Sequence, residues 1–163
     1  MCNTLILGYG NTLRGDDGAG ALAAEAIAAQ ALPGVDVRGL HQLLPELAAP
    51  IAAADLVIFI DAAVDVDADE TLRVQHIQPA SESAPHDTHI STPTGLLAMA
   101  RDLFHALPRA MLVSIPAENF NFGANLSART KRGIDEITRR IAAISDFEFQ
   151  TDSTTSTTST TSI

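Results

Sequence analysis

Residues 5–20 read LILGYGNTLRGDDGAG. A short apolar run that ends in glycine is typical of a buried β-strand, and the glycine-rich loop after it leads into an alanine-rich helix. Two adjacent carboxylates, Asp16 and Asp17, stand where that helix begins. A helix N-terminus carries about half a positive charge and free N–H groups, so it attracts anions, and here the chain supplies its own.

The glycine-rich loop lacks the features of a nucleotide-binding loop. The dinucleotide motif needs three glycines, and after Gly8 and Gly10 the third place holds Leu13. No Walker lysine follows, and a pyrophosphate would meet Asp16 and Asp17 at short range, where like charges repel strongly. A nucleotide-binding module stays an alternative that NAD or ATP can test, but a cation or a polarised peptide bond suits this loop better.

Composition excludes several classes of protein. The chain has 163 residues, 46% of them hydrophobic, which suffices for one core and predicts one domain. Its formal net charge is −10 without a basic stripe, which argues against nucleic acid as a partner. The single cysteine, Cys2, cannot form an internal disulfide, and we find no signal peptide or membrane-spanning run. We therefore expect a soluble cytoplasmic protein that does not bind a membrane.

Strand-like and helix-like segments alternate along the chain. Short apolar runs predict strands at residues 4–8, 35–40, 56–60, 71–77 and 111–115, the fourth of them an edge strand or a half-covered one. Helix signals predict helices at residues 18–31 and 45–54, after the cap Thr92–Pro93, and over about eighteen residues from the cap Ser127. This order predicts an α/β fold, a three-layer α/β/α sandwich of about five mostly parallel strands with helices on both faces.

The C-terminal segment has a different composition. Residues 147–163 form a Ser/Thr-rich tail without an apolar stripe, so we expect it to be disordered and assign the folded domain to residues 1–146.

The predicted fold brings three polar residues to one edge of the sheet, which is the edge where such sheets bind their ligands. Asp17 follows the first strand, Asp61 ends the most apolar strand, and His89 lies just before the third helix. Each has an ordinary alternative: Asp16 or Asp17 as a helix cap, Asp61 in a solvated turn, and His89 as a loop residue, with His86 as a rival.

Two carboxylates and one imidazole form a mixed oxygen and nitrogen ligand set. Such a set suits a borderline divalent ion such as nickel, zinc or iron better than magnesium or calcium. Three protein ligands also leave coordination positions open, as a catalytic or metal-sensing site requires.

These residues lie in segments that resemble the hydrogenase maturation proteases, endopeptidases that trim the C terminus of the large subunit of nickel-iron hydrogenases. The resemblance covers roughly residues 4–144 and rests on GYGNTLRGDDGAG (8–20), QLLPELA (42–48), DLVIFIDA (55–62), THISTP (88–93) and NLSA (125–128). The loop before His89 and the Ser/Thr-rich tail depart from the family pattern.

The resemblance implies a peptidase that acts on a nickel-loaded large-subunit precursor, with the nickel carried by the substrate and read by Asp17, Asp61 and His89. Asp17 or Asp16, or a metal-bound hydroxide, would activate water, so aspartic and metal-assisted mechanisms both stay open. Backbone N–H groups of residues 15–18 would stabilise the oxyanion. The alternative is a non-catalytic nickel-binding chaperone for the same subunit.

Overall fold

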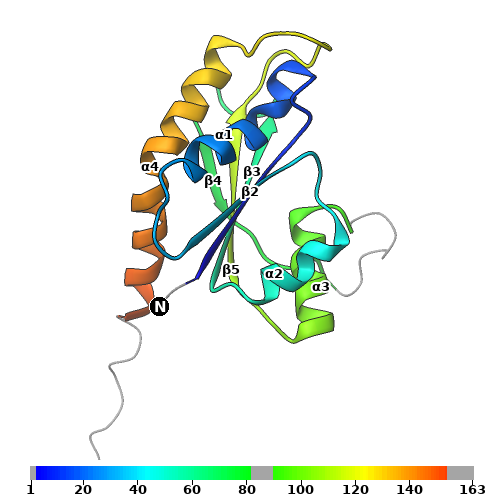
Figure 1. The fold of residues 1–163 in the computed structure, drawn as a ribbon, viewed down its shortest axis with the longest axis vertical. Helices are drawn as coiled ribbons and strands as arrows, with labels where there is room; N and C mark the ends of the chain where they lie inside the picture. The colour runs from blue at the N-terminus through cyan, green and yellow to red at the C-terminus, as the bar shows by residue number, and fades with distance from the viewer. Residues whose placement is uncertain (1–2, 82–89, 154–163) are drawn as a thin grey trace, which may run out of the picture.

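The computed structural model describes residues 3–81 and 90–153, and a five-stranded sheet in the order β2-β1-β3-β5-β4 runs through its centre (Figure 1). The strands are β1 (Thr4–Tyr9), β2 (Val35–Leu40), β3 (Leu56–Ala63), β4 (Arg73–His76) and β5 (Arg109–Pro116). The first three and β5 are parallel, and β4 pairs antiparallel with β5 at one edge. The predicted sheet, with residues 71–77 at its edge, is confirmed.

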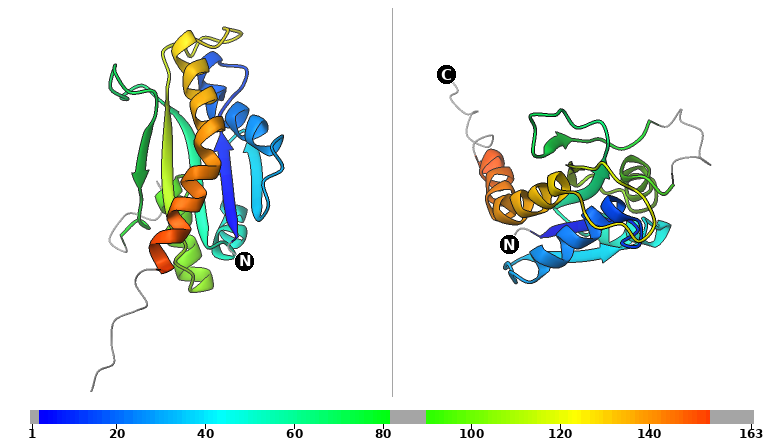
Figure 2. Two further views of the ribbon diagram at one scale, coloured as in Figure 1. Left: turned by 90° about the vertical axis from the view of Figure 1, so that its left-hand side faces the viewer. Right: turned by 90° about the horizontal axis from the view of Figure 1, so that it is seen from above.

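Helices cover both faces of the sheet, which gives the predicted three layers (Figures 1 and 2). One face carries α1 (Ala19–Ala28) and α4 (Ala128–Ser153), and the other carries α2 (Ala48–Ala52) and α3 (Pro93–Phe104). Two short 3₁₀ turns, η1 (Gly15–Gly18) and η2 (Pro45–Leu47), precede α1 and α2.

Alternating side chains of the central strand build a core on each face. Ile58 and Ile60 of β3 pack in the layer of α1 and α4, whereas Val57 and Phe59 pack in the layer of α2 and α3. A strand buried on both faces reads as a continuous apolar run, which is why LVIFI predicts a central strand. Each such side chain contributes roughly 1.5–3 kcal/mol on burial.

Helix α1 begins in direct backbone contact with the ends of β1 and β3. A Cβ atom on Gly20 would lie 2.2 Å from the Ile60 carbonyl oxygen, and one on Gly8 would lie 2.1 Å from the Gly20 carbonyl oxygen. Only glycine fits at such distances. The two glycines therefore bring η1, and with it Asp17, to the strand ends where Asp61 lies.

The first helix, β3 and α4 differ most clearly in extent from the sequence prediction. The first helix starts as η1 before α1, and β3 continues past Asp61 to Ala63 because β5 keeps pairing with it up to Pro116. Helix α4 has 26 residues rather than about eighteen, since no proline or glycine interrupts residues 145–153. It thus runs through residues 147–153, which the sequence assigned to the tail; residues 154–163 lie outside the described residues.

None of the helices in the described part of the chain combines the length and the apolar content that crossing a bilayer requires.

Candidate active site

The glycine-rich loop between β1 and α1 is folded around Asn11. The Asn11 N–H donates to Oδ2 of Asp17 at 3.1 Å, and Oδ1 of Asn11 accepts from the Leu13 N–H at 2.9 Å. Gly10 has φ +143°, and a Cβ atom there would lie 1.9 Å from the Asp17 carbonyl oxygen. Asp17, which is partly buried, is therefore held in place by both its side chain and its backbone.

Asp16 is fully buried and joins this loop to the segment between β5 and α4. Its Oδ2 accepts hydrogen bonds from the N–H groups of Glu118 at 2.8 Å and Asn119 at 3.0 Å, and its Oδ1 accepts from the Ser127 N–H at 2.7 Å. Burial opposes ionisation, but these backbone donors outweigh it and hold the pKa of the Asp16 carboxyl below its usual value.

Neither acid caps a helix, which was the ordinary alternative for both. The first residues of η1 and α1 receive no hydrogen bond from a capping side chain. Asp16 instead bonds to the β5–α4 segment, and Asp17 bonds within its own loop.

Asp61 lies inside the last part of β3 and is partly buried. Its Oδ1 accepts from the Ala62 N–H at 2.7 Å, and the Tyr9 hydroxyl donates to the carboxylate. Burial raises the pKa of Asp61 above its usual value, and the negative charge of Asp17 adds to the rise, while the hydrogen bonds from Tyr9 and Ala62 oppose it. Burial and the charge of Asp61 likewise raise the pKa of Tyr9.

The two predicted carboxylates thus lie at the same edge of the sheet, since η1 packs against β3, and the charge of Asp17 acts on Asp61. Among the described residues, the groups that act on Asp61 are Tyr9, Ala62 and Asp17, and none of them is a cation. Neither Asp17 nor Asp61 forms an ion pair with a described side chain, so a positive ion would be bound favourably at these strand ends.

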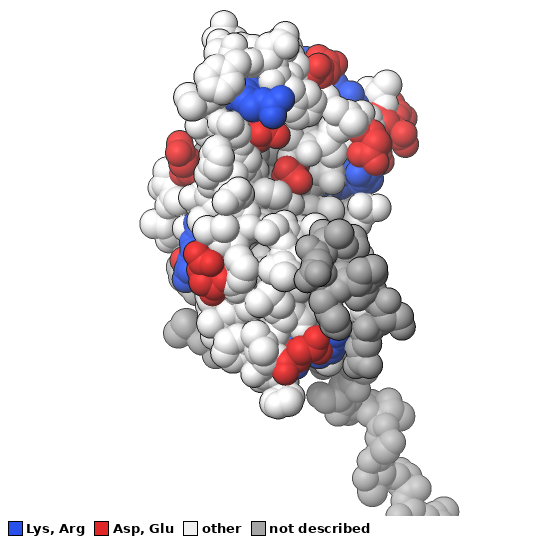
Figure 3. Space-filling model, turned by 90° about the vertical axis from the view of Figure 1, so that its right-hand side faces the viewer, with Lys and Arg blue, Asp and Glu red and all other residues white. Residues whose placement is uncertain are grey.

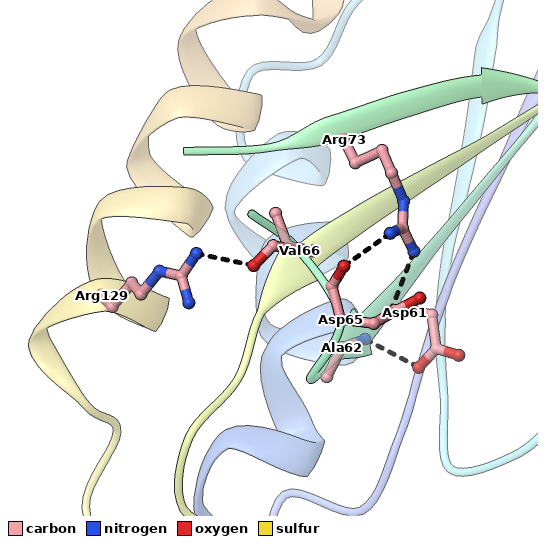
Figure 4. Close-up of polar contacts among 6 residues, drawn as sticks. All are labelled: Asp61, Ala62, Asp65, Val66, Arg73 and Arg129. Atoms are coloured by element: carbon pink, nitrogen blue, oxygen red, sulfur yellow. Dashed lines mark hydrogen bonds and ion pairs between the residues drawn. The ribbon is translucent and has the colours of Figure 1, made fainter. Parts of the chain in front are cut away.

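Arg73 and Arg129 bind the loop that follows β3. Arg73 donates to the Asp65 carboxylate at 3.0 Å and to its carbonyl oxygen at 2.9 Å, and Arg129 donates to the Val66 carbonyl at 3.0 Å. In Figure 4 the Asp61 carboxylate is directed away from the Arg73 guanidinium. Several Asp and Glu side chains lie toward the upper end of the face in Figure 3.

Comparison with known proteins gives matches in structure only. No family model matches the chain, and no curated protein matches its sequence. The [NiFe] hydrogenase maturation protease HycI from Thermococcus kodakarensis KOD1 is 23% identical with a TM-score of 0.65, over 87% of this chain and 91% of that one. The hydrogenase maturating endopeptidase HybD from E. coli is 21% identical with a TM-score of 0.66, over 88% and 93%. The chain has the fold of the hydrogenase maturation proteases.

The maturation-protease fold confirms the architecture that the sequence resemblance implied, and the match spans nearly the whole of those maturation proteases. At these identities the similarity establishes the fold, and the chemistry of the site rests on this chain's own residues.

The third predicted ligand, His89, lies outside the described residues, as does its rival His86. Within residues 3–81 and 90–153, no three His, Cys, Asp or Glu side chains come close enough together to hold a metal ion. The helix that His89 precedes does begin as predicted, since Thr92 accepts from the Gly95 N–H at 3.1 Å. The three-ligand set of Asp17, Asp61 and His89 therefore stays a prediction.

Two features of the site were missed in the sequence. Tyr9 was not singled out, although parallel pairing of Gly8 with Ile60 puts the next residue of β1 beside Asp61. Fewer backbone N–H groups are free to stabilise an oxyanion than the sequence predicted. The N–H of Asp16 donates to the Asn119 carbonyl, and that of Asp17 donates to the Arg14 carbonyl.

Proposed function

We propose that this chain is an endopeptidase that removes a C-terminal peptide from the nickel-loaded large-subunit precursor of a nickel-iron hydrogenase and recognises the nickel in that precursor. The observation that carries the proposal is the pair formed by Asp17 and Asp61, two carboxylates at one strand edge with no described cation between them. The fold shared with hydrogenase maturation proteases supports the same activity.

The charge of the pair favours a metal that arrives with the substrate. The charge of Asp17 disfavours the charged form of Asp61, and a divalent ion that binds both carboxylates relieves this repulsion. With Asp17, Asp61 and His89 as the three proposed ligands, the site leaves positions that the precursor's own ligands fill. Nickel is thus part of the substrate, and a precursor without nickel lacks the group that the pair binds.

The general base is Asp17 in this proposal. Asp16 was an equal candidate from the sequence, but its two oxygens already accept three backbone hydrogen bonds and it is fully buried. Asp17 accepts one hydrogen bond, from Asn11, and is only partly buried. It would take a proton from the attacking water, the water oxygen would bond to the scissile carbonyl carbon, and the proton would pass to the leaving amine as the C–N bond breaks.

The reaction is tested with nickel-loaded and nickel-free precursor and the purified chain. Mass spectrometry of the precursor should show loss of a C-terminal peptide in the loaded sample only. A stable complex with unchanged precursor mass would instead indicate the nickel-binding chaperone. If the chain neither cleaves nor binds a loaded precursor, both functions are contradicted.

A further inference from the structure

Two exposed apolar side chains lie on neighbouring loops beside the proposed active site. Leu13, in the glycine-rich loop, is 61% exposed, and Phe122, in the segment between β5 and α4, is 76% exposed. The Gly123 N–H donates to the Leu13 carbonyl at 2.8 Å, so the two loops are joined at these residues. We call Leu13 and Phe122 the apolar rim.

Single exposed apolar residues are common on protein surfaces, so exposure alone does not indicate a contact. The apolar rim differs because both of its loops are held by specific hydrogen bonds. Asn11 Oδ1 fixes the Leu13 N–H, and Asn119 Oδ1 accepts from the Asn121 N–H at 3.0 Å, just before Phe122. Because neither loop is free to turn its apolar side chain inward, both side chains stay exposed to water.

The apolar rim is also continuous with the proposed nickel-reading site. Asn11 contacts both Leu13 and the Asp17 carboxylate, so one residue sets the position of the rim and of the metal ligand. Asp16 fixes the other loop through Glu118 and Asn119. In Figure 1 the two loops lie together at the end of the molecule where the parallel strands finish, and the second view in Figure 2 agrees.

We propose that the apolar rim docks an apolar segment of the precursor next to its nickel site; this rests on the proposed function. The occupant follows from that continuity, because Asn11 joins the Asp17 carboxylate to Leu13, so a polypeptide whose nickel is bound by Asp17 lies beside the loop that carries Leu13. Aromatic and apolar side chains are the ones that contribute most of the affinity at such contacts. The rim therefore adds to the affinity for the precursor, while the carboxylates recognise its nickel and take part in the cleavage.

The test compares two double variants in the processing of nickel-loaded precursor. The rim variant is Leu13→Gln with Phe122→Gln. The control is Leu103→Gln with Leu107→Gln, since these residues are 63% and 68% exposed but lie where β5 begins, at the opposite end of the sheet. We expect KM for the rim variant to rise about tenfold or more, as loss of apolar burial at two side chains implies, with kcat within about twofold of wild type. The control should keep both constants.

The single variant Phe122→Gln covers the case in which the double variant does not fold, and we expect a rise in KM of at least about threefold for it. An unchanged KM in the folded rim variants, or an equal rise in the control, would overturn the proposed docking surface while cleavage by the wild type upholds the proposed function. Absence of both binding and cleavage by the wild type would instead remove the proposed function, and the docking surface with it.

Discussion

The carboxylate of Asp16 accepts a hydrogen bond from the Ser127 N–H at 2.7 Å, across 111 positions of the chain. With the bonds from Glu118 and Asn119, this contact ties the glycine-rich loop to the segment that leads into α4. The more buried of the two adjacent acids thus holds the loop, and the less buried one, Asp17, is available to a ligand.

Replacement of Asp16 by Asn should destabilise the fold. An amide keeps one acceptor oxygen but turns an N–H₂ group toward backbone donors, so a buried carboxylate with charge-assisted hydrogen bonds is lost. We expect the free energy of unfolding in urea to fall by about 2–4 kcal/mol. The matched variant Asp17→Asn should lower it by about 1 kcal/mol or less, because Asp17 accepts one described hydrogen bond. Equal losses in the two variants would contradict a structural role for Asp16.

The acid stability of the protein should depend on Asp16. Because the pKa of Asp16 is lower in the folded than in the unfolded chain, its contribution is present above the unfolded pKa of about 4 and is lost as the pH falls through the folded pKa. We expect the Tm of the wild type to decline below about pH 4 more steeply than that of Asp16→Asn. Parallel Tm profiles would show that Asp16 does not titrate in this way.

Asp61 should have the opposite effect on stability. Its pKa is raised in the fold, so its ionisation favours the unfolded chain as the pH rises from the unfolded value through the folded one. Asp61→Asn removes this charge and leaves an oxygen that accepts from the Ala62 N–H. We expect its Tm at pH 7 to exceed that of the wild type, with the difference shrinking below about pH 4. A lower Tm at pH 7 would contradict the unfavourable charge of Asp61.

Removal of the Tyr9 hydroxyl tests whether it positions Asp61. Tyr9→Phe loses the hydrogen bond that favours the charged carboxylate, so the pKa of Asp61 should rise further. We expect the acidic limb of the pH profile of precursor processing to move to higher pH, with Tm close to that of the wild type. An unchanged profile would show that Tyr9 contributes only packing.

The backbone contact between α1 and the strands predicts a sharp effect at Gly20. An alanine Cβ would lie 2.2 Å from the Ile60 carbonyl oxygen, so Gly20→Ala must push α1 away from β3. We expect the free energy of unfolding to fall by about 1–3 kcal/mol. Processing of the precursor should also weaken, because Asp17 moves with the helix. Gly39→Ala is the control, since its nearest atom lies at 3.3 Å. A greater loss for the control would contradict this packing.

The sheet, its layers and the approach of Asp17 to Asp61 could be predicted from the sequence. Hydrophobic periodicity and glycine placement are local signals, and the ends of parallel strands share one edge of the sheet. The sequence did not reveal the role of Asp16, whose partners are backbone N–H groups more than 100 positions away and carry no side-chain signature. The end of β3 was missed because its pairing with β5 outlasts the apolar run. His89 lies outside the described residues, so its part in the site stays a prediction.

The pair Asp17 and Asp61 is the centre of this account, and cleavage of nickel-loaded precursor by Asp61→Asn tests it most directly. Asp135→Asn, which alters an exposed carboxylate on α4, is the control. We expect wild type and control to release the C-terminal peptide and Asp61→Asn to leave the precursor intact while remaining folded. Release of the peptide by Asp61→Asn at the wild-type rate would contradict the account.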